Sequence, residues 1–328
     1  MMRITEKKFT ACIFAVLLLF CLSGQVLGME IKLAHVVNEQ DGFHLAAEKF
    51  KEIVEDQTDG EISISIYPNA QLGDERTLLE GMQMGTVDMG IITNGPVANF
   101  VEEIAVFELP FLFPSSEAAY QVLDGPVGQE LLAKLEDVNL KGLAYAERGF
   151  RNLTNSKRPV HSPDDVDGLK IRVMENPVYI DTFKALGANA VPMAWTEALT
   201  AMRQGTIDGQ ENPINVIHAF KLYEQQDHLS LTRHTYAPAI FVMGLGKWNS
   251  LSRDQQEIFL QAAREAAEFE REFNAEMQAR QLKDLEEAGM QIVKDPDLAA
   301  FQEKVGPVYE KYSPRFGQYL QRIQDQLQ

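Results

Sequence analysis

Two arginines and an asparagine, Arg151, Arg172 and Asn212, are the side chains of this sequence best suited to bind a small anion. A guanidinium group is planar, keeps its charge at physiological pH and binds a carboxylate through two parallel hydrogen bonds. An asparagine amide can donate a further hydrogen bond to the same group. Two such arginines beside one amide would therefore form a receptor for an organic acid.

Arg172 lies in a short segment, residues 168–173, that has the pattern of a β-strand. The β-branched Ile171 and Val173 flank it, and side chains alternate between the two faces of a strand. If Ile171 and Val173 face the core, Arg172 faces a cleft or solvent. In the alternative interpretation, Arg172 is an exposed arginine whose ion pair contributes only about 0–1 kcal/mol to stability.

The first 28 residues, 1–28, have the pattern of a cleaved signal peptide. Three basic residues precede an apolar run at 11–22, which is shorter than the roughly 20 residues needed to cross a bilayer. An uncleaved membrane anchor is one alternative. A lipoprotein attached through Cys21 is another, although Phe20 is large for the position before such a cysteine. We therefore expect the protein to be secreted.

Charge and cysteine content exclude several classes of function. The chain has 30 basic against 48 acidic residues, a net charge of −18, and loss of the leader would leave 27 against 47, or −20. Nucleic acid and anionic membranes would repel such a surface. Both cysteines, Cys12 and Cys21, lie in the leader, so the mature chain would have no disulfide and no thiol nucleophile.

Motifs of catalytic and metal sites are absent from the sequence. It contains no Walker phosphate loop, no His-Glu-x-x-His zinc motif and no Gly-x-Ser-x-Gly nucleophile elbow. The six histidines are scattered without metal-ligand spacing. We therefore predict a protein that is not an enzyme and has no cofactor or metal. A secreted α/β enzyme acting on an anionic substrate is the alternative from a different class.

Strands and helices alternate along the chain, which predicts an α/β fold with a largely parallel sheet. The expected elements include strands at 30–37, 61–67, 87–93, 228–235 and 239–246, and helices at 41–56 and 74–84, with an apolar segment at 140–147 that crosses between lobes. Residues 82–88 and 202–208 share the pattern Met-x-x-Gly-Thr-Val/Ile-Asp at a constant offset of 120 residues. This repeat favours two similar lobes, although helix–glycine–strand junctions also recur by chance.

Residues 252–288 are expected to form one long helix of about 55 Å. Ser252 and Gln255 make a capping box at its start, and Gly289 ends it. Apolar residues recur every three or four positions and predict a continuous apolar face. The helix is longer than one small lobe, so it could brace both lobes; the alternative is the seam of a coiled-coil dimer.

Taken together, these segments resemble the periplasmic solute-binding proteins of tripartite ATP-independent (TRAP) transporters, of the dicarboxylate-binding type. The resemblance covers nearly the whole mature chain and includes YPNAQLGDE at 67–75, GLKIRV at 168–173 and DGQENP at 208–213. It implies a two-lobed periplasmic-binding-protein fold, in which each lobe is a mixed sheet flanked by helices and a long helix spans both lobes. The expected lobes are 29–150 with about 237–275, and 151–236 with about 276–328.

The resemblance also implies roles for individual residues. Arg172 would clamp the ligand carboxylate, Arg151 would assist it, and Asn212 would contact the same group. Trp195 occupies an aromatic position that packs on the ligand in this family. From the residues alone, Trp195 could instead be a core residue and Asn212 only a helix N-cap.

The positions that vary with the ligand in the first lobe correspond to Glu75, Thr93 and Asn94. A carboxylate at Glu75 would repel a ligand carboxylate, so we expect it to accept hydrogen bonds from hydroxyls, unless it is only a capping acid. The expected ligand is therefore a sugar acid, such as a uronate or aldonate. A C4-dicarboxylate is the alternative, but it would require a second cation in the first lobe. The resemblance implies that the integral membrane subunits of a TRAP transporter are the partners.

Overall fold

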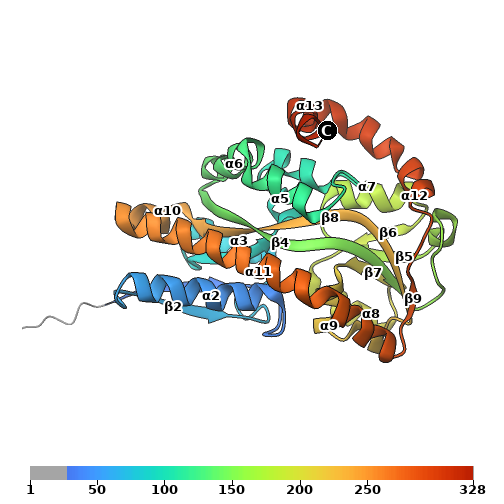
Figure 1. Ribbon diagram of the computed structural model, residues 1–328, viewed down its shortest axis with the longest axis horizontal. Helices are drawn as coiled ribbons and strands as arrows, with labels where there is room; N and C mark the ends of the chain where they lie inside the picture. Colours follow the sequence, from blue (N-terminus) through green and yellow to red (C-terminus); the bar gives the residue numbers. More distant parts are fainter. Residues whose placement is uncertain (1–27, 328) are drawn as a thin grey trace, which may run out of the picture.

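The computed structural model describes residues 28–327, so the predicted signal peptide lies outside the described residues except for Gly28. One nine-stranded sheet forms its centre, in the order β2-β1-β3-β8-β4-β7-β5-β6, with β9 beside β8 (Figure 1). The strands are β1 (Met29–Ala34), β2 (Ile62–Tyr67), β3 (Met89–Thr93), β4 (Leu140–Asn155), β5 (Lys170–Val173), β6 (Asn189–Pro192), β7 (Gly209–Asn212), β8 (His228–Gly244) and β9 (Gln291–Val293). No helix within 28–327 is long and apolar enough to span a membrane.

Helices flank this sheet (Figure 1), and its short strands fall into two groups that we call the lobes. They are α2 (Gly42–Gln57), α3 (Glu75–Met84), α4 (Asn94–Val97), α5 (Ser116–Asp124), α6 (Pro126–Ala133), α7 (Pro177–Ala185), α8 (Trp195–Gln204), α9 (Ile214–Ala219), α10 (Leu245–Ser250), α11 (Arg253–Glu287), α12 (Leu298–Lys304) and α13 (Gly306–Gln326), with a 3₁₀ helix η1 (Glu102–Glu108). The first lobe contains β1–β3 with α2 and α3, and the second contains β5–β7 with α7–α9. The expected first-lobe elements are confirmed within three residues at each end, whereas the lobe boundaries given above stay a prediction.

The sheet is mixed. Strands within each lobe pair in parallel, as β1 does with β2 and β3, and as β5 does with β6 and β7. The long strands β4 and β8 run antiparallel to each other, pass through both lobes and join them; we call them the hinge strands. The two strands expected at 228–235 and 239–246 are one continuous strand, β8. It continues through Pro238 because this residue lies opposite Glu147, next to an irregularity in the ladder where a missing N–H is tolerated.

The internal repeat has a structural counterpart in the two lobes. α3 and α8 each end at a glycine in the left-handed region, Gly85 with φ 75° and Gly205 with φ 65°, where other residues are strained. An aspartate three residues after each glycine forms a hydrogen bond to the neighbouring strand. Asp88 accepts a hydrogen bond from a β1 backbone N–H at 2.8 Å, and Asp208 accepts one from β5 at 2.9 Å. The same local chemistry therefore sets the start of β3 and of β7.

α11 is a single helix of 35 residues and begins with the predicted capping box of Ser252 and Gln255. It packs on α2 in the first lobe and on α9 in the second, so it spans both lobes (Figure 1). The expected continuous apolar face is wrong for the second half of the helix. Most of the buried positions there are polar, among them Glu270 and Asn274, because the helix packs on β4 near the polar residue Glu147.

Glu270 is fully buried, and its Oε2 accepts a hydrogen bond from the backbone N–H of Glu147 at 3.1 Å. The nearest basic residue on β4, Arg148, pairs with Asp41 at 2.8 Å. Burial raises the pKa of Glu270 well above its usual value, and the carboxylates of Glu147 and Asp41 raise it further. The folded protein therefore favours the protonated form of Glu270.

We expect Glu270→Gln to raise the Tm near pH 8, because glutamine has the shape of the protonated acid. A carboxyl group whose pKa is raised by folding destabilises the folded state once the pH exceeds its unfolded pKa, so the gain should shrink as the pH falls towards that value. Thermal unfolding measured across this pH range tests the expectation. Glu268→Gln, an exposed change on the same helix, is the control. A Glu270→Gln protein no more stable than wild type near pH 8 contradicts the assignment.

Candidate functional site

A cavity of about 350 Å³, the interlobe cavity, lies between the lobes at the C-terminal end of β5. The start of α3 and the segment after α4 line it from the first lobe, and β5 and the start of α8 line it from the second. Its polar and aromatic lining residues include Asp74, Glu75, Arg76, Asn99, Phe100, Arg172, Glu175 and Trp195. Three of the predicted site residues, Arg172, Trp195 and Glu75, are therefore brought together.

Arg172 is a buried cation, only 3% exposed. Its Nε and Nη2 atoms donate to the Met193 carbonyl at 3.0 and 2.7 Å, and its guanidinium carbon lies 5.6 Å from the centre of the Trp195 ring. Within residues 28–327 it has no ion pair with any carboxylate. Burial lowers the pKa of Arg172 to about 10, against the attraction of Glu211. Arg172 thus offers a desolvated positive charge to whatever enters the cavity.

Trp195 is the first residue of α8 and lines the cavity beside Arg172. It is 8% exposed and packs edge-on against Phe220, with ring centres 5.0 Å apart. Its indole Nε1 has no hydrogen-bond partner in the described part of the chain. A buried donor without a partner is uncommon, and an acceptor on a ligand would satisfy it. Trp195 therefore belongs to the core of the second lobe and also forms a wall of the cavity.

Glu75 lines the first-lobe side of the cavity, where it follows the N-cap Asp74 of α3. Its Oε1 accepts a hydrogen bond from the backbone N–H of Thr93 at 2.7 Å. Burial raises the pKa of Glu75, while the Thr93 bond and the more distant Arg148 and Arg172 lower it. Glu75 is therefore an acid in the first turn of a helix and also an acceptor placed at the cavity.

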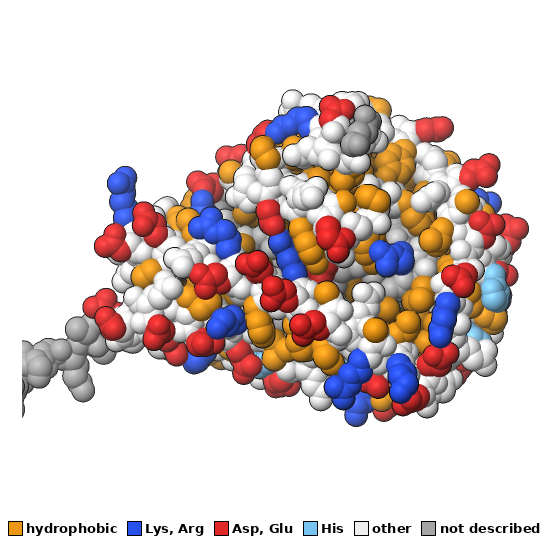
Figure 2. All heavy atoms as spheres, viewed as in Figure 1, with side chains coloured by type: hydrophobic (Ala, Val, Ile, Leu, Met, Phe, Trp, Pro, Cys, Tyr) orange, Lys and Arg blue, Asp and Glu red, His pale blue; other side chains and the backbone are white. Residues whose placement is uncertain are grey.

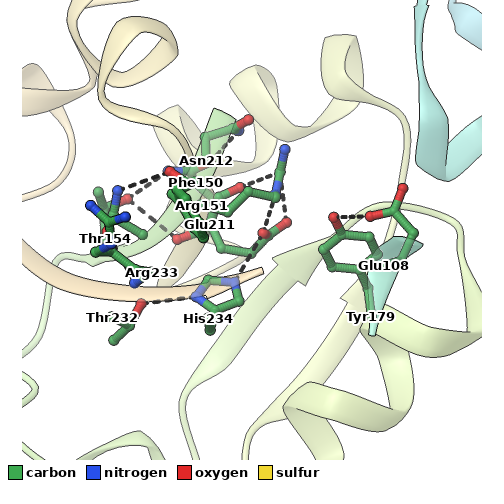
Figure 3. Close-up of polar contacts among 12 residues, drawn as sticks. Glu108, Phe150, Arg151, Thr154, Tyr179, Glu211, Asn212, Thr232, Arg233 and His234 are labelled. Atoms are coloured by element: carbon green, nitrogen blue, oxygen red, sulfur yellow. Dashed lines mark hydrogen bonds and ion pairs between the residues drawn. The ribbon is translucent and has the colours of Figure 1, made fainter. Parts of the chain in front are cut away.

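Arg151, on β4, already has a carboxylate partner (Figure 3). Its Nε and Nη2 atoms donate to the two carboxylate oxygens of Glu211, and Nη2 also donates to the Glu211 backbone carbonyl at 2.6 Å. Burial alone would lower the pKa of Arg151, but the Glu211 carboxylate raises it above its usual value. The same ion pair and His234 hold the pKa of Glu211 low despite its burial. Arg151 is therefore committed to a buried ion pair.

Four further residues of this region were not predicted: Glu211, His234, Glu108 and Tyr179. His234 lies 3.2 Å from the Glu211 carboxylate, and the Tyr179 hydroxyl donates to Glu108 across the lobes (Figure 3). Glu211 could have been suspected, because it stands within the segment 208–213 next to Asn212. The other three carry no local signal in the sequence.

Asn212 and Asn94 do not line the interlobe cavity. Asn212 is buried and donates to the Gln210 side chain at 2.5 Å, and Pro213 rather than Asn212 is the N-cap of α9. Asn94 is fully buried and donates to Glu108 at 2.8 Å. The roles predicted for Arg151, Asn212, Thr93 and Asn94 at the ligand stay predictions, since these residues form the layer behind Arg172 and Glu75.

Direct hydrogen bonds join the two lobes around the cavity. The Asn99 side chain donates to the Glu175 carbonyl at 2.7 Å, and the Asn176 side chain donates to the Gly95 carbonyl at 3.1 Å. These bonds close the space around Arg172. No cluster of three or more His, Cys, Asp or Glu side chains in residues 28–327 could hold a metal ion.

Residues 33–315 match the family of bacterial extracellular solute-binding proteins, family 7. The chain belongs to this family. A solute-binding protein of Verminephrobacter eiseniae is 41% identical over 289 residues, which cover 88% of this chain and 86% of that protein. The 2,3-diketo-L-gulonate-binding periplasmic protein of Escherichia coli is 36% identical over 284 residues, 87% of each chain.

Solved structures of TRAP solute-binding proteins share this fold. The sugar acid binding protein of Advenella mimigardefordensis, in complex with galactonate, has a TM-score of 0.89 and 34% identity, and the match covers 92% of this chain and 98% of that one. A protein from Polaromonas sp. bound to D-erythronate has a TM-score of 0.89 and 38% identity over 90% and 98% of the two chains. The predicted family and the two-lobed α/β fold are thereby confirmed.

We expect the two arginines of this solute-binding protein to differ in their effect on stability. Arg151→Met would leave Glu211 buried without its partner, which costs about 3–5 kcal/mol. Arg172→Met would remove a buried charge that has no partner, so it should retain or exceed wild-type stability. The free energy of unfolding, measured by denaturant titration without ligand, tests the difference. Equal losses in the two variants would show that Arg172 is neutralised within the protein.

Proposed function

We propose that this solute-binding protein captures a sugar acid in the interlobe cavity, through an ion pair between Arg172 and the ligand carboxylate. The buried, unpaired charge of Arg172 is the observation that carries the proposal. A carboxylate would supply two parallel charge-assisted hydrogen bonds and the missing negative charge. In a closed cavity these bonds gain strength, because water no longer screens them.

The acids on the opposite side of the cavity favour a ligand with hydroxyl groups. Glu75 and Asp74 line the first-lobe wall, where they would accept hydrogen bonds from hydroxyls and repel a second carboxylate. The sugar acids carried by the relatives agree with this, since galactonate and D-erythronate each have one carboxylate and several hydroxyls.

A C4-dicarboxylate is the second candidate ligand. A C4-dicarboxylate-binding protein of Bacillus subtilis is 30% identical over 89% of this chain and 84% of that protein. Arg76 is the cation on the first-lobe side of the cavity, but it pairs with Glu80 at 3.0 Å. Its charge is thus already balanced, which favours the sugar acid over the dicarboxylate.

We infer that the protein is a periplasmic receptor rather than an enzyme, and that it delivers its ligand to the integral membrane subunits of a TRAP transporter. The names of the relatives support this, because they describe periplasmic and TRAP solute-binding proteins. The secreted-enzyme alternative requires consumption of the sugar acid. A turnover assay on a sugar acid that binds would distinguish the two, since a receptor returns the ligand unchanged.

Arg172→Ala should weaken binding of the sugar acid at least about 30-fold, because losing one partner of a buried charge pair costs about 2–5 kcal/mol. Arg172→Lys should also bind weakly, since an ammonium group cannot form two parallel bonds. Isothermal titration calorimetry with galactonate, galacturonate and erythronate provides the measurement. Arg253→Ala, which alters an exposed arginine in the first turn of α11, is the control. An unchanged affinity in Arg172→Ala would refute the clamp.

Glu75→Gln should change the choice of ligand more than the fold. The amide keeps the size of the side chain but loses its charge, so binding of a dicarboxylate should improve relative to that of a sugar acid. A thermal-shift screen of both classes against wild type and variant measures the ratio, because a bound ligand raises Tm by mass action. The same ranking of ligands in both proteins would show that Glu75 does not determine ligand specificity.

A further inference from the structure

A second cavity, of about 860 Å³, lies between α11, α5 and the hinge strands. We call it the hinge cavity. It is larger than the interlobe cavity, and the two cavities have no lining residue in common. Figure 2 shows the face of the molecule that carries α11, where acidic and basic side chains mix instead of gathering by sign.

The two cavities lie on opposite faces of the hinge strands. On β4, Phe150 lines the hinge cavity, whereas its neighbour Arg151 pairs with Glu211 beside the Arg172 site. On β8, Arg233 lines the hinge cavity, whereas His234 contacts Glu211 (Figure 3). Since strand side chains alternate between faces, each hinge strand contributes consecutive residues to the two sites.

The buried arginines of the hinge cavity already have carboxylate partners. Arg148 pairs with Asp41 at 2.8 Å, and Arg271 pairs with Asp124 at 2.6 Å. The lining as a whole has four arginines against five carboxylates, which makes it nearly neutral. The hinge cavity therefore lacks the unpaired buried cation that makes the interlobe cavity a site for an acid.

Uncharged polar side chains form much of the inner wall. Asn215, Asn274 and Gln281 line the cavity and are only 5–9% exposed. The Asn274 Nδ2 donor has no hydrogen-bond partner among the described residues. Beside it, the carboxylate of Glu147 accepts a hydrogen bond from the Tyr120 hydroxyl at 2.8 Å. Amides and hydroxyls both donate and accept, which is also the property of adjacent hydroxyl groups on a polyol.

Two aromatic rings complete the cavity lining. The Arg233 guanidinium lies 4.2 Å from the centre of the Phe150 ring, and that of Arg271 lies 4.3 Å from the centre of the Tyr120 ring. Stacked rings and guanidinium groups make flat, partly apolar walls. Flat walls beside a few polar groups are the usual composition of a small-molecule site. They suit the C–H face of a sugar ring.

We propose that the hinge cavity is a second ligand site, which takes a neutral polyhydroxylated molecule such as a sugar or sugar alcohol. Its amides and Glu147 bind the hydroxyls, and its aromatic rings pack on the carbon skeleton. The site does not use Arg172 and does not depend on the function proposed for the interlobe cavity. Because both sites share the hinge strands, each ligand changes the affinity of the other by the same factor.

Calorimetric titration of the purified protein with glucose, xylose and mannitol tests this site, and at least one of them should bind. Ala275→Trp, at an exposed α11 position that lines the cavity, should weaken that binding roughly tenfold or more by filling the space. Ala279→Trp, one turn further along at an exposed position outside the lining, is the matched control and should leave the affinity unchanged.

Arg172→Ala separates the two sites, because it should abolish binding of the sugar acid and preserve binding of the neutral sugar. The proposal is overturned if none of the three probes binds, or if Ala275→Trp binds them as wild type does. It is also overturned if Arg172→Ala removes the neutral sugar, because that result places it in the interlobe cavity. An affinity for galactonate that is the same with and without saturating sugar would refute the coupling.

Discussion

The unmatched positive charge of Arg172 is the constraint on which the rest of the site depends. The side chain is 3% exposed and is held by one backbone carbonyl, that of Met193. Removing a cation from water costs several kcal/mol unless an anion compensates it. Because Arg172 lines the interlobe cavity, an anionic ligand bound there would compensate this cost. On the proposed function, affinity for carboxylates depends first on this charge, before any contact specific to one acid is made.

The ion pair between Arg151 and Glu211 neutralises the second buried arginine, so Arg172 remains the one buried arginine here without a carboxylate partner in residues 28–327. Two buried guanidinium groups side by side would repel each other and disfavour the fold. Glu211 binds Arg151 through both carboxylate oxygens, and His234 contacts the same carboxylate. Arg172, Arg151 and Glu211 together therefore carry a net charge of one, which a monocarboxylate such as a sugar acid matches. A dicarboxylate would bring a second charge towards Glu75, where nothing balances it.

Features that depend on neighbouring residues, such as helix caps and turns, could be predicted from the sequence. Contacts between residues far apart in the sequence could not. The capping box at Ser252 and the left-handed turn at Gly205 are set within a few positions, so they were predictable. Family resemblance placed Arg172 in a cleft. The partner of Arg151 lies 60 residues away, on a strand whose register the sequence does not reveal. The hydrogen bond from Asn94 to Glu108 likewise joins residues on separate elements and was not predicted, and the role of Asn94 at the ligand stays a prediction.

The bonds between the lobes explain how one charge can govern closure. Asn99 and Asn176 donate to backbone carbonyls across the cavity, and neutral hydrogen bonds of this kind contribute about 0.5–1.5 kcal/mol each. Burying Arg172 without an anion opposes them by a cost of comparable or larger size. On the proposed function, the cost of burying Arg172 offsets these bonds whenever no anion is bound. In that proposal a bound carboxylate compensates the charge of Arg172, and the neutral bonds between the lobes are then no longer opposed.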